Sequence, residues 1–182
     1  MIQACSMDDQ VTFHAIHNLI RPFRDIVQVK WSQTGFVSGQ LHETPRNLMA
    51  FKDGTVNPRH TDEYKDYVFI DDGWAKNGTY CIIRRIQIHI ETWDRTALEE
   101  QEATFGRKRI SGAPLTGKKE FDEMDLGAKD SSGEYVIPAD AHARLAHEAK
   151  TSIKRRAYNY TAGTNDKTGA LETGLLFISF QK

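Results

Sequence analysis

The spacing of apolar residues in the first 32 positions changes from a helical to a strand-like period. Residues 6–23 place most of their apolar side chains on one face, which predicts an amphipathic helix. Residues 1–6 resemble the end of a strand, and residues 26–31 alternate between apolar and polar side chains, which predicts a second strand. The order strand, helix, strand is half of a small α+β unit.

Strand patterns return after a loop-rich stretch of the chain. Residues 66–70 form a short apolar run, and residues 78–94 alternate isoleucine with polar side chains, so both segments are predicted strands. Residues 107–138 are polar and rich in glycine, proline and acids, which predicts a long insertion. The remaining expected elements are helices at 96–106 and 139–149 and strands at 156–160 and 174–181.

This order of elements predicts an α+β fold of the ferredoxin-like kind, the dimeric α/β barrel type, with antiparallel sheets. Residues 1–32 are the expected remnant of a first ferredoxin-like domain, and residues 33–65 are the expected connecting segment with the distal motif discussed below. Residues 66–182 are the expected second domain, without the final helix and strand that would close its sheet. The fold is thus expected to be incomplete at both ends, and its unpaired edges favour a homo-oligomer or aggregation.

Composition excludes several classes of partner. The 24 Lys and Arg residues nearly balance the 25 Asp and Glu residues, so there is no overall charge to attract nucleic acid. No apolar run approaches the ~18 residues of a membrane span, and no secretory apolar segment follows Met1. The two cysteines form no CxxC motif, which argues against zinc-knuckle and thioredoxin-like sites.

The stretch NLMAFKDGTVNPRH, residues 47–60, is the first candidate for chemistry. Its apolar run ends at Asp53, and Gly54 and Pro58 then constrain the chain. A carboxyl group beside buried apolar side chains can serve as a proton acceptor and donor. Asp-Gly is also a common way to build a turn, so a purely structural turn stays open as the alternative.

Histidine and arginine supply two further candidates. His147 follows His142 at a spacing of five, one more than would place two metal ligands over one helical face. A single histidine can still bind one axial position of a haem iron. Arg155 and Arg156 form a doublet before a predicted strand. An ordinary histidine at His142 and a solvated strand end at Arg155 remain the alternatives from the residues alone.

Five segments occur in this order along the chain: NLMAFKDGTVNP, ETWDRTALEEQEATFGRKRISGAPL, AHARLA, KRRAYNY and GLLFISFQ. Together they resemble the dye-decolourising (DyP-type) haem peroxidases, in particular the deferrochelatase/peroxidase branch that accompanies bacterial iron uptake. The resemblance covers nearly the whole chain, and FKDGTxNP and WDRT…FGR…GAPL are its most specific parts. It implies a haem b enzyme that reduces hydrogen peroxide and oxidises dyes or porphyrinogens, or that releases iron from haem as a deferrochelatase.

The same resemblance implies roles for individual residues. Asp53 matches the distal acid of the family's Gly-x-x-Asp-Gly motif, and Arg155 matches the distal arginine that stabilises charge as the peroxide O–O bond breaks. His142 matches the proximal iron ligand, and Arg156 is then a structural or propionate-pairing residue. The expected cofactor-binding residues are Gly54, Thr55, Val56, His142 and Arg155.

The chain departs from the family pattern in two places that affect these expectations. Ala50 occupies the first glycine position of the motif, and His147 and Glu148 stand where an Asn-Pro pair is expected. Two other interpretations therefore stay open. In one, the chain binds or delivers haem through His142 without significant turnover; in the other, it is a truncated fragment without function.

The resemblance also sets the expected partners. They are hydrogen peroxide and a reducing substrate, together with components of bacterial iron uptake; nucleic acid is not expected. The resembled branch is often exported to the periplasm or cell surface, but the residues give no localisation for this chain.

Overall fold

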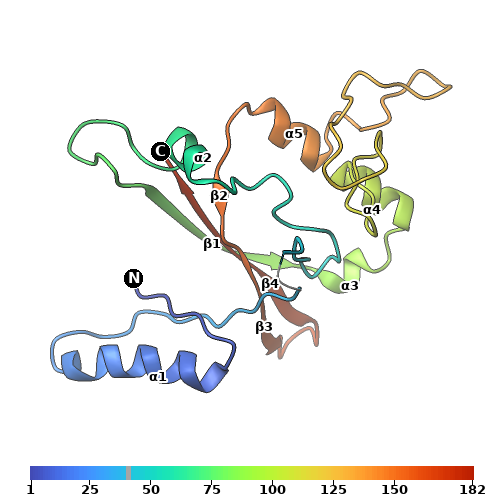
Figure 1. Cartoon of the computed structure of the whole chain (residues 1–182). Helices are drawn as coiled ribbons and strands as arrows, with labels where there is room; N and C mark the ends of the chain where they lie inside the picture. The colour runs from blue at the N-terminus through green and yellow to red at the C-terminus, as the bar shows by residue number, and fades with distance from the viewer. Residues whose placement is uncertain (40–41) are drawn as a thin grey trace. The chain divides into compact units, whose positions relative to one another are not determined.

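Two units make up the computed structural model, which describes residues 1–39 and 42–182 (Figure 1). The first unit is Met1–Thr34 and the second is Gly35–Lys182. The assignment of residues 1–32, 33–65 and 66–182 to parts of two ferredoxin-like domains stays a prediction.

The first unit consists of one helix with flanking coil. Helix α1 (Asp9–Ile20) runs directly into the 3-10 helix η1 (Arg21–Phe23), which confirms the predicted helix. Asp8 begins α1, because its Oδ1 accepts the backbone N–H groups of Gln10 and Val11 at 2.7 and 3.2 Å.

The two strands predicted in this unit are wrong. Residues 1–6 and 26–31 are not strands. A strand must satisfy its backbone N–H and C=O groups by pairing, and within the described residues neither segment has such a partner. Alternation of apolar and polar side chains is what a paired strand shows, but it does not reveal whether a partner strand is present.

The second unit is built around one central strand. Strand β4 (Leu171–Gln181) pairs antiparallel with β1 (Tyr80–Ile88) along one edge. Along its other edge it pairs successively with β2 (Lys154–Arg155) and β3 (Tyr158–Thr164). This antiparallel sheet with flanking helices confirms the α+β, ferredoxin-like class predicted from the sequence, and it fixes Arg155 on the sheet.

The core of the sheet lies where β3 and β4 pack together. Tyr160, Leu176 and Ile178 form its buried cluster. Gly174 is required there: a Cβ at this position would collide with the Ile86 carbonyl oxygen of β1 and lie 2.7 Å from the Tyr160 hydroxyl. Close approach of β1 and β4 therefore depends on a residue without a side chain.

The helices of the described part of the second unit lie beside its sheet (Figure 1). They are α2 (Thr61–Tyr67), α3 (Ile90–Trp93), α4 (Leu98–Phe105) and α5 (His142–Glu148). The last two confirm the predicted helices at 96–106 and 139–149. Among the described residues, the helices are all too short or too polar to cross a bilayer.

The strand predicted at 66–70 is wrong, because α2 occupies its first two residues and the rest form a turn. The carboxylate of Glu63 accepts the backbone N–H groups of Arg59 and His60 at 2.7 and 2.8 Å. This satisfies two N–H groups that precede the helix. Val68, the first residue after α2, is buried.

Candidate functional site

An aromatic cluster anchors the loop that carries Asp53. Phe51 is almost fully buried and stacks on Phe105 of α4, with ring centroids 3.9 Å apart. Trp93 of α3 packs edge-on against both rings at 6.3 and 5.8 Å. Phe105 also lies edge-on to the ring of His142, at 6.1 Å. The apolar run before Asp53 thus fastens the loop to the core and connects it with His142.

The backbone of this loop is held in an unusual conformation. Ala50 has a φ of 67°, in the left-handed region that glycine adopts without cost. Arg46 supports the turn, because its Nη1 donates to the carbonyls of Ala50 and Arg109 at 2.7 and 2.6 Å. The Asp53 N–H donates to the Pro45 carbonyl at 2.8 Å. The glycine position of the motif therefore keeps a glycine-like geometry although alanine occupies it.

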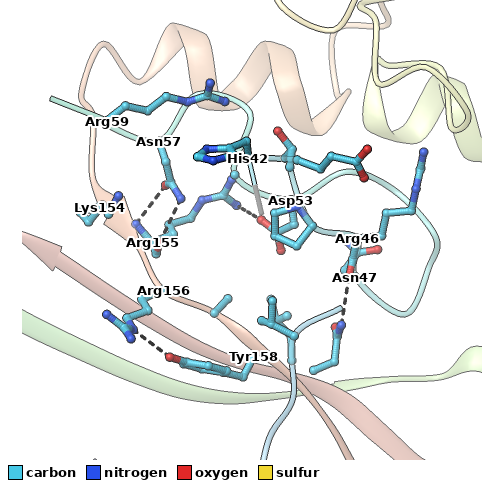
Figure 2. Close-up of a pocket in the computed structure, with 18 residues that line it drawn as sticks. His42, Arg46, Asn47, Asp53, Asn57, Arg59, Lys154, Arg155, Arg156 and Tyr158 are labelled. Carbon is cyan, nitrogen blue, oxygen red and sulfur yellow. Dashed lines mark hydrogen bonds and ion pairs between the residues drawn. The ribbon is translucent and has the colours of Figure 1, made fainter. Parts of the chain in front are cut away.

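Asp53 and Arg155 form an ion pair across the site (Figure 2). Arg155 Nη1 lies 3.0 Å from Asp53 Oδ1, and the two side chains are only 22% and 15% exposed. Arg155 comes from β2 and Asp53 from the loop after Phe51, so the fold brings together two residues that are far apart in sequence.

The backbone of Arg155 is held by the same loop. Asn57 Nδ2 donates to the Arg155 carbonyl at 3.0 Å, and Asn57 Oδ1 accepts the Arg155 N–H at 3.1 Å. Gly54, between Asp53 and Asn57, has a φ of 110°. A side chain at Gly54 would be strained by this backbone conformation and would crowd the Asn57 amide.

Glu120 ties the other side of the loop to the long insertion. Its carboxylate forms an ion pair with Lys52 and accepts the Thr55 hydroxyl at 3.0 Å. Burial raises the pKa of Glu120, but hydrogen bonds from Lys52, Thr44 and Thr55 outweigh it and bring the pKa below its ordinary value. Glu120 is therefore ionised and holds the loop through Lys52 and through its hydrogen bond with the Thr55 hydroxyl. Val56 is 70% exposed.

His142 is the first residue of α5, and Arg144 fixes that helix. Arg144 is buried and donates to the Ile137 carbonyl at 3.1 and 2.7 Å and to the Leu126 carbonyl at 2.7 Å. His142 itself belongs to the exposed residues of α5. Partial desolvation of its imidazole lowers its pKa, the charge of Arg155 lowers it further, and the charge of Asp53 raises it. The net shift is downward, which favours the neutral imidazole that can ligate a metal.

A cavity of about 570 Å³ opens beside the ion pair (Figure 2). Asp53, Gly54 and Arg155 line it, so the structure brings three of the predicted site residues together. The lining given by the described residues does not include Thr55, Val56 or His142. Thr55 and Val56 lie in the same loop between Gly54 and Asn57. His142 interacts with the charges of Asp53 and Arg155 and contacts the ring of Phe105. The wall is mainly basic: its charged residues are Arg46, Arg59, Lys154, Arg155 and Arg156, against Glu43 and Asp53.

Three residues that matter to this geometry were missed from the sequence: Asn57, Glu120 and Arg144. Asn57 was interpreted as part of an Asn-Pro turn, and Glu120 lies in the polar insertion, where nothing nearby indicates a partner. Arg144 did carry a signal, since it sits inside the AHARLA segment. An arginine on a short, otherwise apolar helical stretch is a candidate for burial with its hydrogen bonds satisfied.

The arrangement supports two kinds of chemistry. A carboxylate that is paired with a guanidinium can take up and return a proton while the arginine compensates developing negative charge. A neutral imidazole on a fixed helix can ligate an iron from one side. Both functions require the positions of Asp53, Arg155 and His142 to be fixed, and the contacts above fix them.

Comparison with known proteins places the chain in a family. The model for "Dyp-type peroxidase, C-terminal" matches residues 44–182, and that for "Dyp-type peroxidase, N-terminal" matches residues 1–37. A protein of Yersinia pseudotuberculosis named Deferrochelatase is 38% identical over 198 residues, covering all of this chain and 45% of the relative. The chain therefore spans about half the length of the curated relatives it matches.

Solved structures agree with these matches. A DyP-type peroxidase from Cellulomonas bogoriensis is 36% identical with a TM-score of 0.89, over 97% of this chain and 51% of that one. An X-ray generated oxyferrous complex of DtpA from Streptomyces lividans is 35% identical with a TM-score of 0.88, over 96% and 50%. The chain belongs to the Dyp-type peroxidase family.

Proposed function

We propose that this chain carries the haem site of a Dyp-type peroxidase, which reduces hydrogen peroxide and oxidises a reducing substrate such as a dye or porphyrinogen. The observation that carries the proposal is the Asp53–Arg155 ion pair at the wall of a cavity, with both charges acting on the pKa of His142. Membership of the family and the oxyferrous and ferric forms of DtpA support haem as the cofactor. We propose haem b in particular.

The residues present fit this cofactor. His142 offers an imidazole whose lowered pKa favours the iron-binding form, on a helix fixed by Arg144. The basic wall beside the ion pair suits the negative carboxylates of a haem. In this proposal His142 would ligate the iron, Gly54, Thr55 and Val56 would contact the porphyrin, and Arg155 would contribute its positive charge beside it.

Haem, when bound, supplies the redox chemistry of peroxide reduction. The protein supplies proton transfer and charge compensation. The carboxylate of Asp53, paired with Arg155, would accept a proton from one oxygen of hydrogen peroxide and return it to the other. The guanidinium of Arg155 stabilises the negative charge that develops as the O–O bond breaks. His142 would hold the iron through its imidazole.

A second candidate function is release of iron from haem, favoured by the name Deferrochelatase of the curated relatives. In that case His142 keeps its role as ligand and Asp53 and Arg155 matter less. Partnership with bacterial iron-uptake components belongs to this hypothesis and stays a prediction, as does a homo-oligomer.

A haem titration of the purified chain, followed by peroxide turnover at matched haem occupancy, tests the proposal. We expect a Soret band in the wild type and in Asp53→Asn, and turnover in the wild type alone. The amide preserves the shape of Asp53 but cannot take the proton, so a loss of about 10²–10⁴-fold is expected. Undiminished turnover in Asp53→Asn would remove Asp53 from the mechanism. Metal-free porphyrin fluorescence appearing at equal rates in both proteins would favour iron release.

A further inference from the structure

The Asp53–Arg155 ion pair joins two side chains from different elements. Arg155 Nη1 lies 3.0 Å from Asp53 Oδ1. Ion pairs of this kind are weak when long side chains must be ordered to form them. Their geometry therefore depends on how accurately the two backbones are placed relative to each other.

Asn57 supplies that placement. Its amide donates to the Arg155 carbonyl at 3.0 Å and accepts the Arg155 N–H at 3.1 Å, so one side chain satisfies both backbone groups of the residue (Figure 2). Arg155 lies in register with Ser179 of β4 on its other side. The amide of Asn57 thus takes the place of a neighbouring strand residue at the open edge of β2.

The chain between Asp53 and Asn57 is shaped for this contact. The Asn57 N–H donates to the Gly54 carbonyl at 3.0 Å, which closes a tight turn. An added Cβ at Gly54 would lie 3.0 Å from Asn57 Nδ2, where it would push the amide away. Lys154 makes a separate tie, from its Nζ to the Pro58 carbonyl at 2.8 Å. The Asp53 carboxylate and the Asn57 amide, which binds the backbone of Arg155, are therefore carried by the same tight turn.

We propose that Asn57 is a positioning residue, which holds the backbone of Arg155 through two hydrogen bonds so that its guanidinium meets Asp53. The consequence for catalysis rests on the proposed peroxidase function. The positioning itself is a property of the folded chain and can be measured without haem.

The test is the coupling between Asp53 and Arg155, obtained from a double-mutant cycle with Asp53→Asn and Arg155→Gln. Urea unfolding at pH 7 gives the equilibrium constant of each variant. We expect a coupling of roughly tenfold in the wild-type background, within the usual range for residues in contact. In the Asn57→Ala background we expect the coupling between Asp53 and Arg155 to disappear, so that the effects of the two substitutions simply add. A merely structural Asn57 would lower overall stability and leave the coupling unchanged.

Lys154→Met is the matched control, because it removes the neighbouring tie to Pro58 without touching the backbone of Arg155. It should preserve the coupling. An equal loss of coupling in Lys154→Met, an unchanged coupling in Asn57→Ala, or no coupling in the wild type would each overturn the proposal. If Asn57→Ala does not fold, Asn57→Gln replaces it, since the same amide is displaced by one methylene.

A measurement on the wild type alone completes the test. The Arg155 amide should be protected from hydrogen exchange by Asn57 Oδ1, and a freely exchanging amide would overturn the proposal. The two proposals fail separately. A chain that binds no haem but loses coupling in Asn57→Ala keeps the positioning role and refutes the peroxidase. A haem-loaded, active chain whose coupling is unchanged in Asn57→Ala keeps the peroxidase function and refutes the positioning role.

Discussion

Replacing Glu120 by glutamine tests how the loop around Asp53 is held. Glutamine keeps the size of the side chain and removes its charge. It leaves the ammonium of Lys52, whose side chain is 21% exposed, without its counter-ion, and it weakens the hydrogen bond from the Thr55 hydroxyl. The change should therefore loosen the loop from the insertion that carries Glu120.

The magnitude follows from the burial of the pair. Removing one partner of a fully buried ion pair costs about 3–5 kcal/mol, and a hydrogen bond to a charged group contributes about 1.5–3 kcal/mol. Lys52 and Glu120 retain 21% and 10% exposure, so water compensates part of the loss. We expect a decrease of about 2 kcal/mol in the free energy of unfolding at pH 7. For a chain of this size, that lowers Tm by roughly 4–8 °C.

The effect should depend on pH in a defined direction. The pKa of Glu120 is lowered in the folded chain, so the unfolded chain binds more protons as the pH falls past the ordinary glutamate value of about 4.3. The stabilisation is thus complete above that value and is lost as the pH falls through the lowered pKa. The wild type and Glu120→Gln should differ at pH 7 and converge at acid pH.

Urea unfolding of both proteins over this pH range measures the difference. Glu123→Gln is the control, since Glu123 is an exposed acid of the same segment, and it should change stability by less than about 0.5 kcal/mol. A deficit below that size in Glu120→Gln at pH 7, or one that persists undiminished in acid, would refute the assignment of the stabilisation to the carboxylate charge.

Three further variants probe other parts of the molecule. His142→Ala should abolish a stable Soret band while His147→Ala, at the exposed end of α5, should not; equal loss from both would contradict a single ligand. Ala50→Gly should raise the free energy of unfolding by up to about 1 kcal/mol, because glycine relieves the positive φ; a destabilised protein would show that the strain is absent. Gly174→Ala should destabilise the sheet by about 3 kcal/mol or more in urea unfolding, since its Cβ collides with the Ile86 carbonyl; a change under about 1 kcal/mol would mean that β1 and β4 separate easily.

Local pattern predicted the elements that pair or pack with their neighbours in the expected way. Ile82, Ile86 and Ile88 lie in β1 as predicted, whereas the end of the strand predicted at 78–94 forms α3. The helical periods became α1 and α4. The strand predicted at 26–31 failed because apolar alternation describes a face, and residues elsewhere in the chain decide whether a partner covers that face. The strand predicted at 66–70 failed because a short apolar run does not distinguish a strand from the end of a helix.

The site was less predictable than the fold for the same reason. Asp53, His142 and Arg155 were each a weak candidate by itself, and only the family resemblance joined them. The contacts that fix them are between distant segments, such as Asn57 with Arg155 and Lys52 with Glu120. A turn-forming asparagine and an acid in a polar insertion look the same whether or not such a partner exists.

The central place of β4 has a consequence for biosynthesis. During translation β1 leaves the ribosome roughly 80 residues before β4, which at about 5–20 residues per second is a delay of several seconds. β2 and β3 also depend on β4 for their pairing, so no part of this sheet can assemble until β4 has emerged. Throughout that interval the isoleucine face of β1 has no partner strand from the sheet. The nascent chain should therefore need a holding chaperone more than a fold whose neighbouring strands follow one another in sequence.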